Sequence, residues 1–334
     1  MNTRITAPPS IDAVADDFDK VLKKGMDEVE ERIRENCRHD QTMIKRTAEH
    51  ALLSGGKRLR SRFILASHLI FQDGLSKEAI DTATAAELFH TATLLHDDVL
   101  DEANLRRGRE AVNAKWGMRH AVLLGDYLLS RSFRLLRGTD SMQILASFIE
   151  TALDLAEGAL TEQIHKDDLA LNEEVYLSII VQKTASFFST CAGSGAMLAG
   201  TSDDNMKILR EFGRNFGMAF QITDDIMDVV SDESTMGKPR GQDILEGHLT
   251  LPLIKYFEKN SPHIPAKKLS ELKLDDPEFI KIMEGLNRDG ALSYSYTKAD
   301  DFIRASLASL DRLPPNAATT HFKRLACDLS RRKA

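Results

Sequence analysis

The stretch ELFHTATLLHDDVLDEANLRRG, residues 87–108, joins an apolar helical segment to a cluster of acidic side chains. The segment from Leu88 to Leu95 is mostly apolar, and Asp97, Asp98 and Asp101 follow it directly. A spacing of four residues places Asp97 and Asp101 on one helical face. The stretch therefore predicts a helix that is buried over most of its length and presents carboxylates at its end.

The same D-D-x-x-D pattern occurs again at Asp224, Asp225 and Asp228, after the apolar run 216–222. Carboxylates this close repel one another unless a positive charge lies between them. A solvated acidic face is the alternative interpretation, but the apolar segments before both motifs favour a metal site at the mouth of a bundle. Oxygen ligands without a paired histidine or cysteine select a hard cation, and Mg²⁺ is the best candidate.

Helical periodicity extends over most of the chain, and alternating strand-like runs are largely absent. The sequence has no proline between Pro9 and Pro239, which suits helices. We predict helices at 21–37, 42–54, 60–71, 77–101, 121–136, 141–165, 173–199, 205–231 and 249–259. The fold class we expect is all-α: an N-terminal arm at 1–12, then a single large helical bundle over 13–334. Within it we predict a surface loop over 261–278 before two final helices.

Composition narrows the function classes. The 334 residues carry a net charge of −7 at pH 7 and no basic stripe, so nucleic acid is not an expected partner. Three widely spaced cysteines indicate free thiols in a reducing compartment, and the N-terminus lacks the features of a signal peptide. The longest uncharged run, 184–202, is too polar for a membrane span and predicts a buried helix. We expect a cytoplasmic protein with no transmembrane segment.

Basic residues occur in small clusters along the sequence. In GGKRLR, residues 55–60, glycines free backbone amides while Lys57 and Arg60 share a helical face. This pattern is typical of a phosphate-binding site. A helix C-cap followed by surface charge is an equally good interpretation. Arg106 and Arg107 follow the first aspartate motif, where two guanidinium groups can address diphosphates.

Three further positions are weaker candidates. The pair Lys183-Thr184 and the single Lys238 can hold phosphate, although each alone is typical of ordinary surface charge. His90 lies two turns before Asp97 on the same face, so a polar role and a core position are both open. Together these residues predict a bundle that holds one diphosphate through magnesium and a second through Lys and Arg, and that shelters a hydrocarbon.

The chain resembles the trans-isoprenyl diphosphate synthases, or polyprenyl synthetases, and is most similar to the long-chain octaprenyl and decaprenyl diphosphate synthases. The resemblance covers nearly the whole chain and rests on segments 55–60, 87–108, 125–126, 183–184, 220–228 and 236–254. It implies an isoprenoid synthase bundle around a central cavity, and a homodimer. Two departures are Ser61, where the family usually has proline, and His248, where lysine is common.

The resemblance also implies roles for individual residues. All six motif aspartates, Asp97, Asp98, Asp101, Asp224, Asp225 and Asp228, would be catalytic. Magnesium, about three ions per active site, would be coordinated by Asp97, Asp101, Asp224 and Asp228. The allylic diphosphate would be held by Arg106, Lys183, Thr184, Gln221 and Lys238. Isopentenyl diphosphate would be held by Lys57, Arg60, His90 and Arg107.

The implied reaction condenses isopentenyl diphosphate with an allylic prenyl diphosphate by Mg-assisted ionisation. Thr93 and Ala92 lie four and five residues before Asp97, and their small size implies a deep tunnel unless Phe133 or Leu129 sets its floor. By resemblance the product is then a long all-trans chain of about C40 to C50, a quinone side-chain precursor, with transient membrane contact on release.

Three other functions remain as alternatives: a shorter-chain farnesyl or geranylgeranyl diphosphate synthase, a terpene cyclase, and a non-catalytic synthase subunit. A cyclase would more often replace the second aspartate motif, and a regulatory subunit would be expected to lose one motif. Both motifs are present here, which disfavours the last two alternatives.

Overall fold

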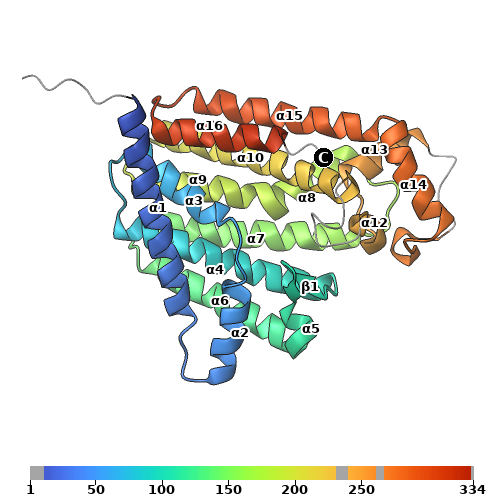
Figure 1. Cartoon of the computed structure of the whole chain (residues 1–334), viewed down its shortest axis with the longest axis horizontal. Coiled ribbons are helices and arrows are strands. Elements are labelled where there is room, and N and C mark those ends of the chain that lie inside the picture. Colours follow the sequence, from blue (N-terminus) through green and yellow to red (C-terminus); the bar gives the residue numbers. More distant parts are fainter. Residues whose placement is uncertain (1–10, 231–239, 261–266, 332–334) are drawn as a thin grey trace, which may run out of the picture.

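The computed structural model describes residues 11–230, 240–260 and 267–331, and almost all of its elements are helices (Figure 1). The all-α prediction is therefore confirmed. The helices are α1 (Ile11–Asn36), α2 (Thr42–Leu52), α3 (Leu59–Leu69), α4 (Lys77–Leu100), α5 (Val112–Trp116), α6 (Met118–Arg137), α7 (Met142–Ile164), α8 (Glu173–Ile180), α9 (Ser186–Leu198), α10 (Asp203–Val230), α12 (Gln242–Glu246), α13 (Leu251–Lys259), α14 (Pro277–Arg288), α15 (Ala291–Leu310) and α16 (Ala317–Ser330). A π-helical turn (Val181–Ala185) joins α8 to α9, and a 3₁₀ turn covers Leu269–Glu271.

The long helices lie roughly side by side, and α1 crosses them near one end (Figure 1). Helix α4 packs against α6 and α3, while α10 packs against α9 and α15. Between these helices lies an aromatic core centred on Phe63 of α3, whose ring lies 5.0 Å from that of Phe188 and 4.8 Å from that of Phe216. This core packs α3, α9 and α10 against one another.

The uncharged run 184–202 forms the buried helix that its composition predicts. Helix α9 approaches its neighbours closely because it contacts them through small residues: a Cβ on Gly195 would lie 2.1 Å from the Ile64 carbonyl oxygen. A Cβ on Gly213 of α10 would likewise lie 2.5 Å from the Phe188 carbonyl oxygen. Within the described residues, no helix is long and apolar enough to span a membrane.

Several local features differ from the sequence prediction. Strands β1 (Leu105–Arg106) and β2 (Arg109–Glu110) form a hairpin too short to show alternation in the sequence. The predicted helix 173–199 is interrupted by the π-helical turn. Three helices, not two, end the chain, because α14 begins at Pro277 inside the predicted loop, where proline at the first helical position starts a helix. Helix α1 already begins at Ile11, within the predicted arm.

Candidate active site

A cavity of about 890 Å³ receives side chains from both aspartate motifs. Asp97, near the end of α4, and Asp224, on α10, both line it, although 127 residues separate them in the sequence. The remaining walls combine basic side chains with apolar ones from α4, α6, α7 and α9. One aspartate of each motif therefore lies at the same partly apolar cavity.

The first motif divides between the cavity and the protein interior. Burial, together with the charges of Asp101 and Glu162, raises the pKa of Asp97 to about 6 against the lowering effect of Lys183. Burial would also raise the pKa of Asp101, but the nearby His248, whose Nε2 lies 3.8 Å from the Asp101 carboxylate, and the charge of Lys183 outweigh it, so that this pKa lies below its usual value.

Asp98, the middle member, is 3% exposed and forms a salt bridge with Arg106, whose Nε donates to it at 2.7 Å. Asp98 therefore contributes to the cavity through Arg106, which lines it, whereas Asp97 lines the cavity directly. The side-chain amide of Asn113 donates to the Asp98 and Ala103 carbonyls, at 2.9 and 2.8 Å, and anchors the chain after α4.

The second motif divides in the same way. Asp224 is exposed to the cavity, whereas Asp225 is 5% exposed and accepts hydrogen bonds from the Tyr176 hydroxyl at 2.6 Å and the Gln221 amide at 2.8 Å. Burial raises the pKa of Asp225, as do the neighbouring aspartates 224 and 228. Asp228, also buried, accepts from the backbone N–H of Asp243 at 3.2 Å and so contacts the start of α12.

The π-helical turn between α8 and α9 presents Lys183 and Thr184 to the cavity. Lys183 forms an ion pair with Glu162 of α7, and the Thr184 hydroxyl donates to Gln221 at 2.8 Å. The turn passes so close to α7 that a Cβ on Gly158 would lie 2.9 Å from the backbone nitrogen of Lys183. The wider π-helical turn gives Lys183 and Thr184 directions that differ from those in a regular α-helix.

A second basic group also lines the cavity. Lys57, Arg60, His90 and Arg107 all line it. The guanidinium of Arg60 lies 4.6 Å from the ring centroid of Phe188, and its Nε has no hydrogen-bond partner among the described residues. Burial, reinforced by the charges of Arg60 and Arg107, holds the pKa of His90 well below its usual value, so its imidazole is neutral.

Aromatic residues close the apolar part of the cavity. Thr93 lines it, as predicted, and so does Leu129 of α6. Ala92 is 1% exposed and is not among the lining residues, because the rotation of α4 turns it into the core. One turn below Thr93, Phe89 lines the cavity together with Phe187 of α9, the two ring centroids lying 4.9 Å apart.

The donor set fits a hard divalent cation. Asp97 and Asp101 lie close enough for the charge of each to affect the other, and such groups are stabilised by a cation that oxygen ligands bind. Beside Asp101, Glu246 and His248 complete a group whose ligand atoms all lie within 4.8 Å of one another. Sequence reasoning missed Glu246, Glu162 and Tyr176, because their roles depend on contacts with distant residues. Lys238 lies outside the described residues.

The comparisons with known proteins agree with this geometry. The family model described as polyprenyl synthetase matches residues 41–283. The chain belongs to this family. The short chain isoprenyl diphosphate synthase of Methanothermobacter thermautotrophicus is 35% identical over 306 residues, covering 89% of this chain and 93% of that protein. The all-trans-nonaprenyl-diphosphate synthase of Rhodobacter capsulatus, described as specific for geranyl diphosphate, is 34% identical over 307 residues, covering 89% and 92%.

Among solved structures, the polyprenyl synthase of Caulobacter crescentus in complex with calcium and isoprenyl diphosphate superimposes with a TM-score of 0.89 at 32% identity. The match covers 96% of this chain and 98% of that one. The protein is thus a prenyltransferase of the trans-prenyl diphosphate synthase type, with the isoprenoid synthase helical fold. Enzymes of this family condense isopentenyl diphosphate with an allylic diphosphate and are generally magnesium-dependent.

Proposed function

We propose that this prenyltransferase makes a long all-trans polyprenyl diphosphate, about C40 to C50, that serves as a quinone side-chain precursor. The observation that carries the proposal is the lining of the cavity by Thr93, one turn below Asp97. A small side chain at this point leaves room for an allylic chain to grow past the first helical turn. The alanines 152, 156 and 159 of α7 support the same conclusion, because they also line the cavity.

A shorter product, in the farnesyl to geranylgeranyl range, is the second candidate. Phe89 lies eight residues before Asp97, about 12 Å along the helix, which is much less than the extended length of eight isoprene units. Its ring contacts those of Phe133, Phe148 and Phe187, with centroids 4.9–6.1 Å apart. A long product therefore requires these rings to move aside, and a short one does not.

The chain's own residues have distinct roles in the proposed reaction. Asp97, Asp101, Asp224 and Asp228 would hold magnesium, about three ions, which neutralises charge on the allylic diphosphate. Lys183 and Arg106 bind the same diphosphate and stabilise the negative charge that develops as its C–O bond ionises. Thr184 and Gln221, joined by their hydrogen bond, and Lys238 complete this group.

Lys57, Arg60, His90 and Arg107 hold isopentenyl diphosphate so that its alkene attacks the allylic cation. The neutral His90 can donate one hydrogen bond without adding charge beside Arg60. The proton lost after condensation goes to the released diphosphate. Apolar walls such as Leu155 and Phe187 exclude water, which would otherwise quench the cation.

A homodimer is part of the proposal. One face of α7 lines the cavity through Leu155 and its neighbours, and another face leaves a stripe of apolar side chains exposed. The stripe consists of Ile149, Leu153, Leu160 and Ile164, which are 50–77% exposed and recur at helical spacing. Leu123 on the adjacent α6 is 67% exposed. A second copy of the chain would bury this surface.

The test is to incubate the purified chain with farnesyl diphosphate, labelled isopentenyl diphosphate and Mg²⁺, and to separate the products by chromatography after dephosphorylation. Products of about C40 to C50 are expected. Products that stop at or below C20 would support the second candidate instead. Absence of any incorporation would overturn the assignment of the substrates.

A further inference from the structure

The loop that carries Lys57 and leads to Arg60, at the start of α3, has an unfavourable backbone conformation that the surrounding structure must hold in place. Between α2 and α3, Gly55 and Gly56 have positive φ angles of 86° and 129°, and Arg58 follows with 48°. Glycine adopts this region readily, but a residue with a Cβ does so only where other contacts compensate. Arg58 precedes α3 without forming a side-chain cap, so the compensation has to come from its guanidinium.

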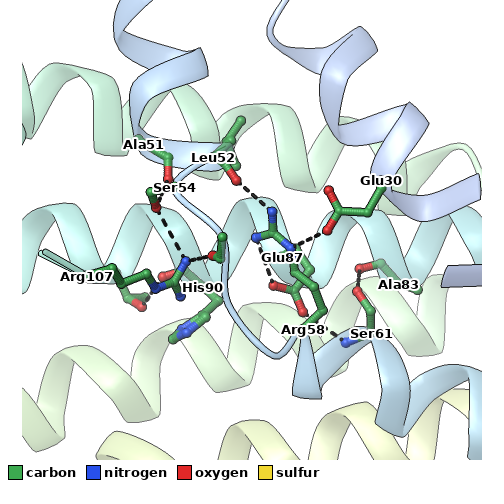
Figure 2. Close-up of polar contacts among 12 residues, drawn as sticks. Glu30, Ala51, Leu52, Ser54, Arg58, Ser61, Ala83, Glu87, His90 and Arg107 are labelled. Carbon is green, nitrogen blue, oxygen red and sulfur yellow. Dashed lines mark hydrogen bonds and ion pairs between the residues drawn. The ribbon is translucent and has the colours of Figure 1, made fainter. Parts of the chain in front are cut away.

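That guanidinium ties the loop to three helices (Figure 2). The Arg58 side chain is 5% exposed; its Nε donates to Glu30 of α1 at 2.7 Å and its Nη2 to the Leu52 carbonyl at the end of α2, also at 2.7 Å. Its Nη1 lies 3.6 Å from Glu87 of α4. Each nitrogen of the fork thus has a partner on a different helix, which a lysine ammonium cannot reproduce.

Glu87 connects the same contacts to the start of α3. Its side chain is 1% exposed, and its Oε1 accepts the backbone N–H of Ser61 at 3.1 Å, one of the amides that a helix start leaves without an internal partner. The Ser61 hydroxyl donates to the Ala83 carbonyl at 2.8 Å and fixes α3 against α4. Serine at this position, in place of the proline usual in the family, therefore adds two hydrogen bonds.

Arg107 holds the loop from the opposite side. Its guanidinium donates to the Gly55 carbonyl and lies so close to Gly56 that a Cβ there would be 2.9 Å from its Cζ (Figure 2). The loop is therefore held between Arg107 and the largely buried Arg58, and both arginines border the cavity. Lys57 and Arg60, which flank Arg58 and line the cavity, take their positions from this arrangement.

We propose that Arg58, held by Glu30 and Glu87, is a positioning residue for the second diphosphate site: it fixes the loop so that Lys57 and Arg60 address isopentenyl diphosphate together. The inference rests on the proposed binding of that substrate by Lys57 and Arg60. It adds a functional link from α1 to the cavity, since Glu30 is absent from the cavity lining.

Steady-state kinetics with isopentenyl diphosphate and farnesyl diphosphate test the proposal. Arg58→Lys is expected to raise the KM for isopentenyl diphosphate about ten- to a hundredfold, because small misplacements of binding groups are costly, and to leave the KM for farnesyl diphosphate within about twofold. Glu30 can affect the substrate only through Arg58. Glu30→Gln is therefore expected to raise the KM for isopentenyl diphosphate about three- to tenfold. The matched control is Arg32→Gln. It breaks the ion pair between Arg32 of α1 and Asp81 of α4, which lies away from the loop.

The outcomes separate this inference from the proposed function. If Lys57→Ala does not raise the KM for isopentenyl diphosphate, the assignment of the site itself fails. If Lys57→Ala raises it but Arg58→Lys and Glu30→Gln do not, the positioning role is wrong. Equal changes in both KM values, accompanied by the same loss of thermal stability in Arg32→Gln, would show that Arg58 only stabilises the fold.

Discussion

The hydroxyl of Tyr176 on α8 donates a 2.6 Å hydrogen bond to the buried carboxylate of Asp225 on α10. Asp225 in turn accepts from Gln221, which accepts from Thr184. The middle aspartate of the second motif therefore connects α8 to two residues of the proposed diphosphate site. Its contribution to catalysis is expected to be indirect, through the placement of Gln221 and Thr184.

Tyr176→Phe should lower kcat about tenfold and destabilise the fold by about 1–3 kcal/mol, because it leaves the buried carboxylate with one partner fewer. Asp225→Ala should abolish turnover while the protein remains folded. Activity assays combined with urea unfolding measure both effects. Tyr294→Phe is the matched control, since its hydroxyl donates to Glu173 at 2.7 Å away from the cavity. Full activity in Tyr176→Phe would contradict the proposed connection.

Asp97→Ala should reduce incorporation of isopentenyl diphosphate by about a hundred- to a thousandfold, since it removes a proposed ligand for the cation that would stabilise the leaving diphosphate. Without metal, the Asp97→Ala variant should be no less stable than the wild type. The carboxylate that it removes is buried beside two other acids that raise its pKa. Radiolabel incorporation and thermal unfolding without metal measure the two effects. Asp204→Ala is the control and should behave as wild type, because Asp204 is exposed beside Asp203 at the start of α10.

Thr93→Phe should shorten the products, because an aromatic ring one turn below Asp97 would block the cavity. Phe89→Ala should lengthen them by removing part of the aromatic floor. Chromatography of the dephosphorylated products measures both shifts. Ala92→Val is the control, since this position faces the core and not the cavity. A product distribution unchanged in Thr93→Phe would place the growing chain elsewhere.

Glu173 supplies a pH dependence of stability outside the active site. Burial would raise its pKa, but hydrogen bonds from Lys255, Lys298 and Tyr294 outweigh burial and lower it to about 2 from 4.5. A lowered folded-state pKa stabilises the fold above pH 4.5, and this stabilisation is lost as the pH falls toward 2. Glu173→Gln should therefore lower Tm at pH 7 and less so at pH 3. The exposed Glu174→Gln should show no such trend.

Leu153→Asp should dissociate the proposed homodimer, because it places a charge in the exposed apolar stripe of α7. Sedimentation equilibrium of the variant is expected to give the mass of one chain where the wild type gives twice that mass. Leu274→Asp is the control, since Leu274 is 46% exposed but lies before α14, away from the stripe. A monomeric wild type would remove this part of the proposal.

The sequence by itself determined most of the long helices and the types of charged side chain near the cavity. Helical periodicity is a local property, so α4 was predicted to within one residue of its observed bounds, and the spacing of Asp97 and Asp101 followed from it. Short elements were less predictable: the two-residue strands β1 and β2 are too short to carry a periodic signal, and Pro277 indicated a loop where it starts a helix.

Only the tertiary structure decided which residues face the cavity and what holds them there. Asp97 and Asp98 are adjacent, yet one lines the cavity and the other pairs with Arg106, since helix rotation and packing assign each side chain its neighbours. The contact of Arg58 with Glu30 crosses 28 positions of the sequence, and that of Tyr176 with Asp225 crosses 49. No local pattern encodes such pairs, because they form only when separate helices pack together.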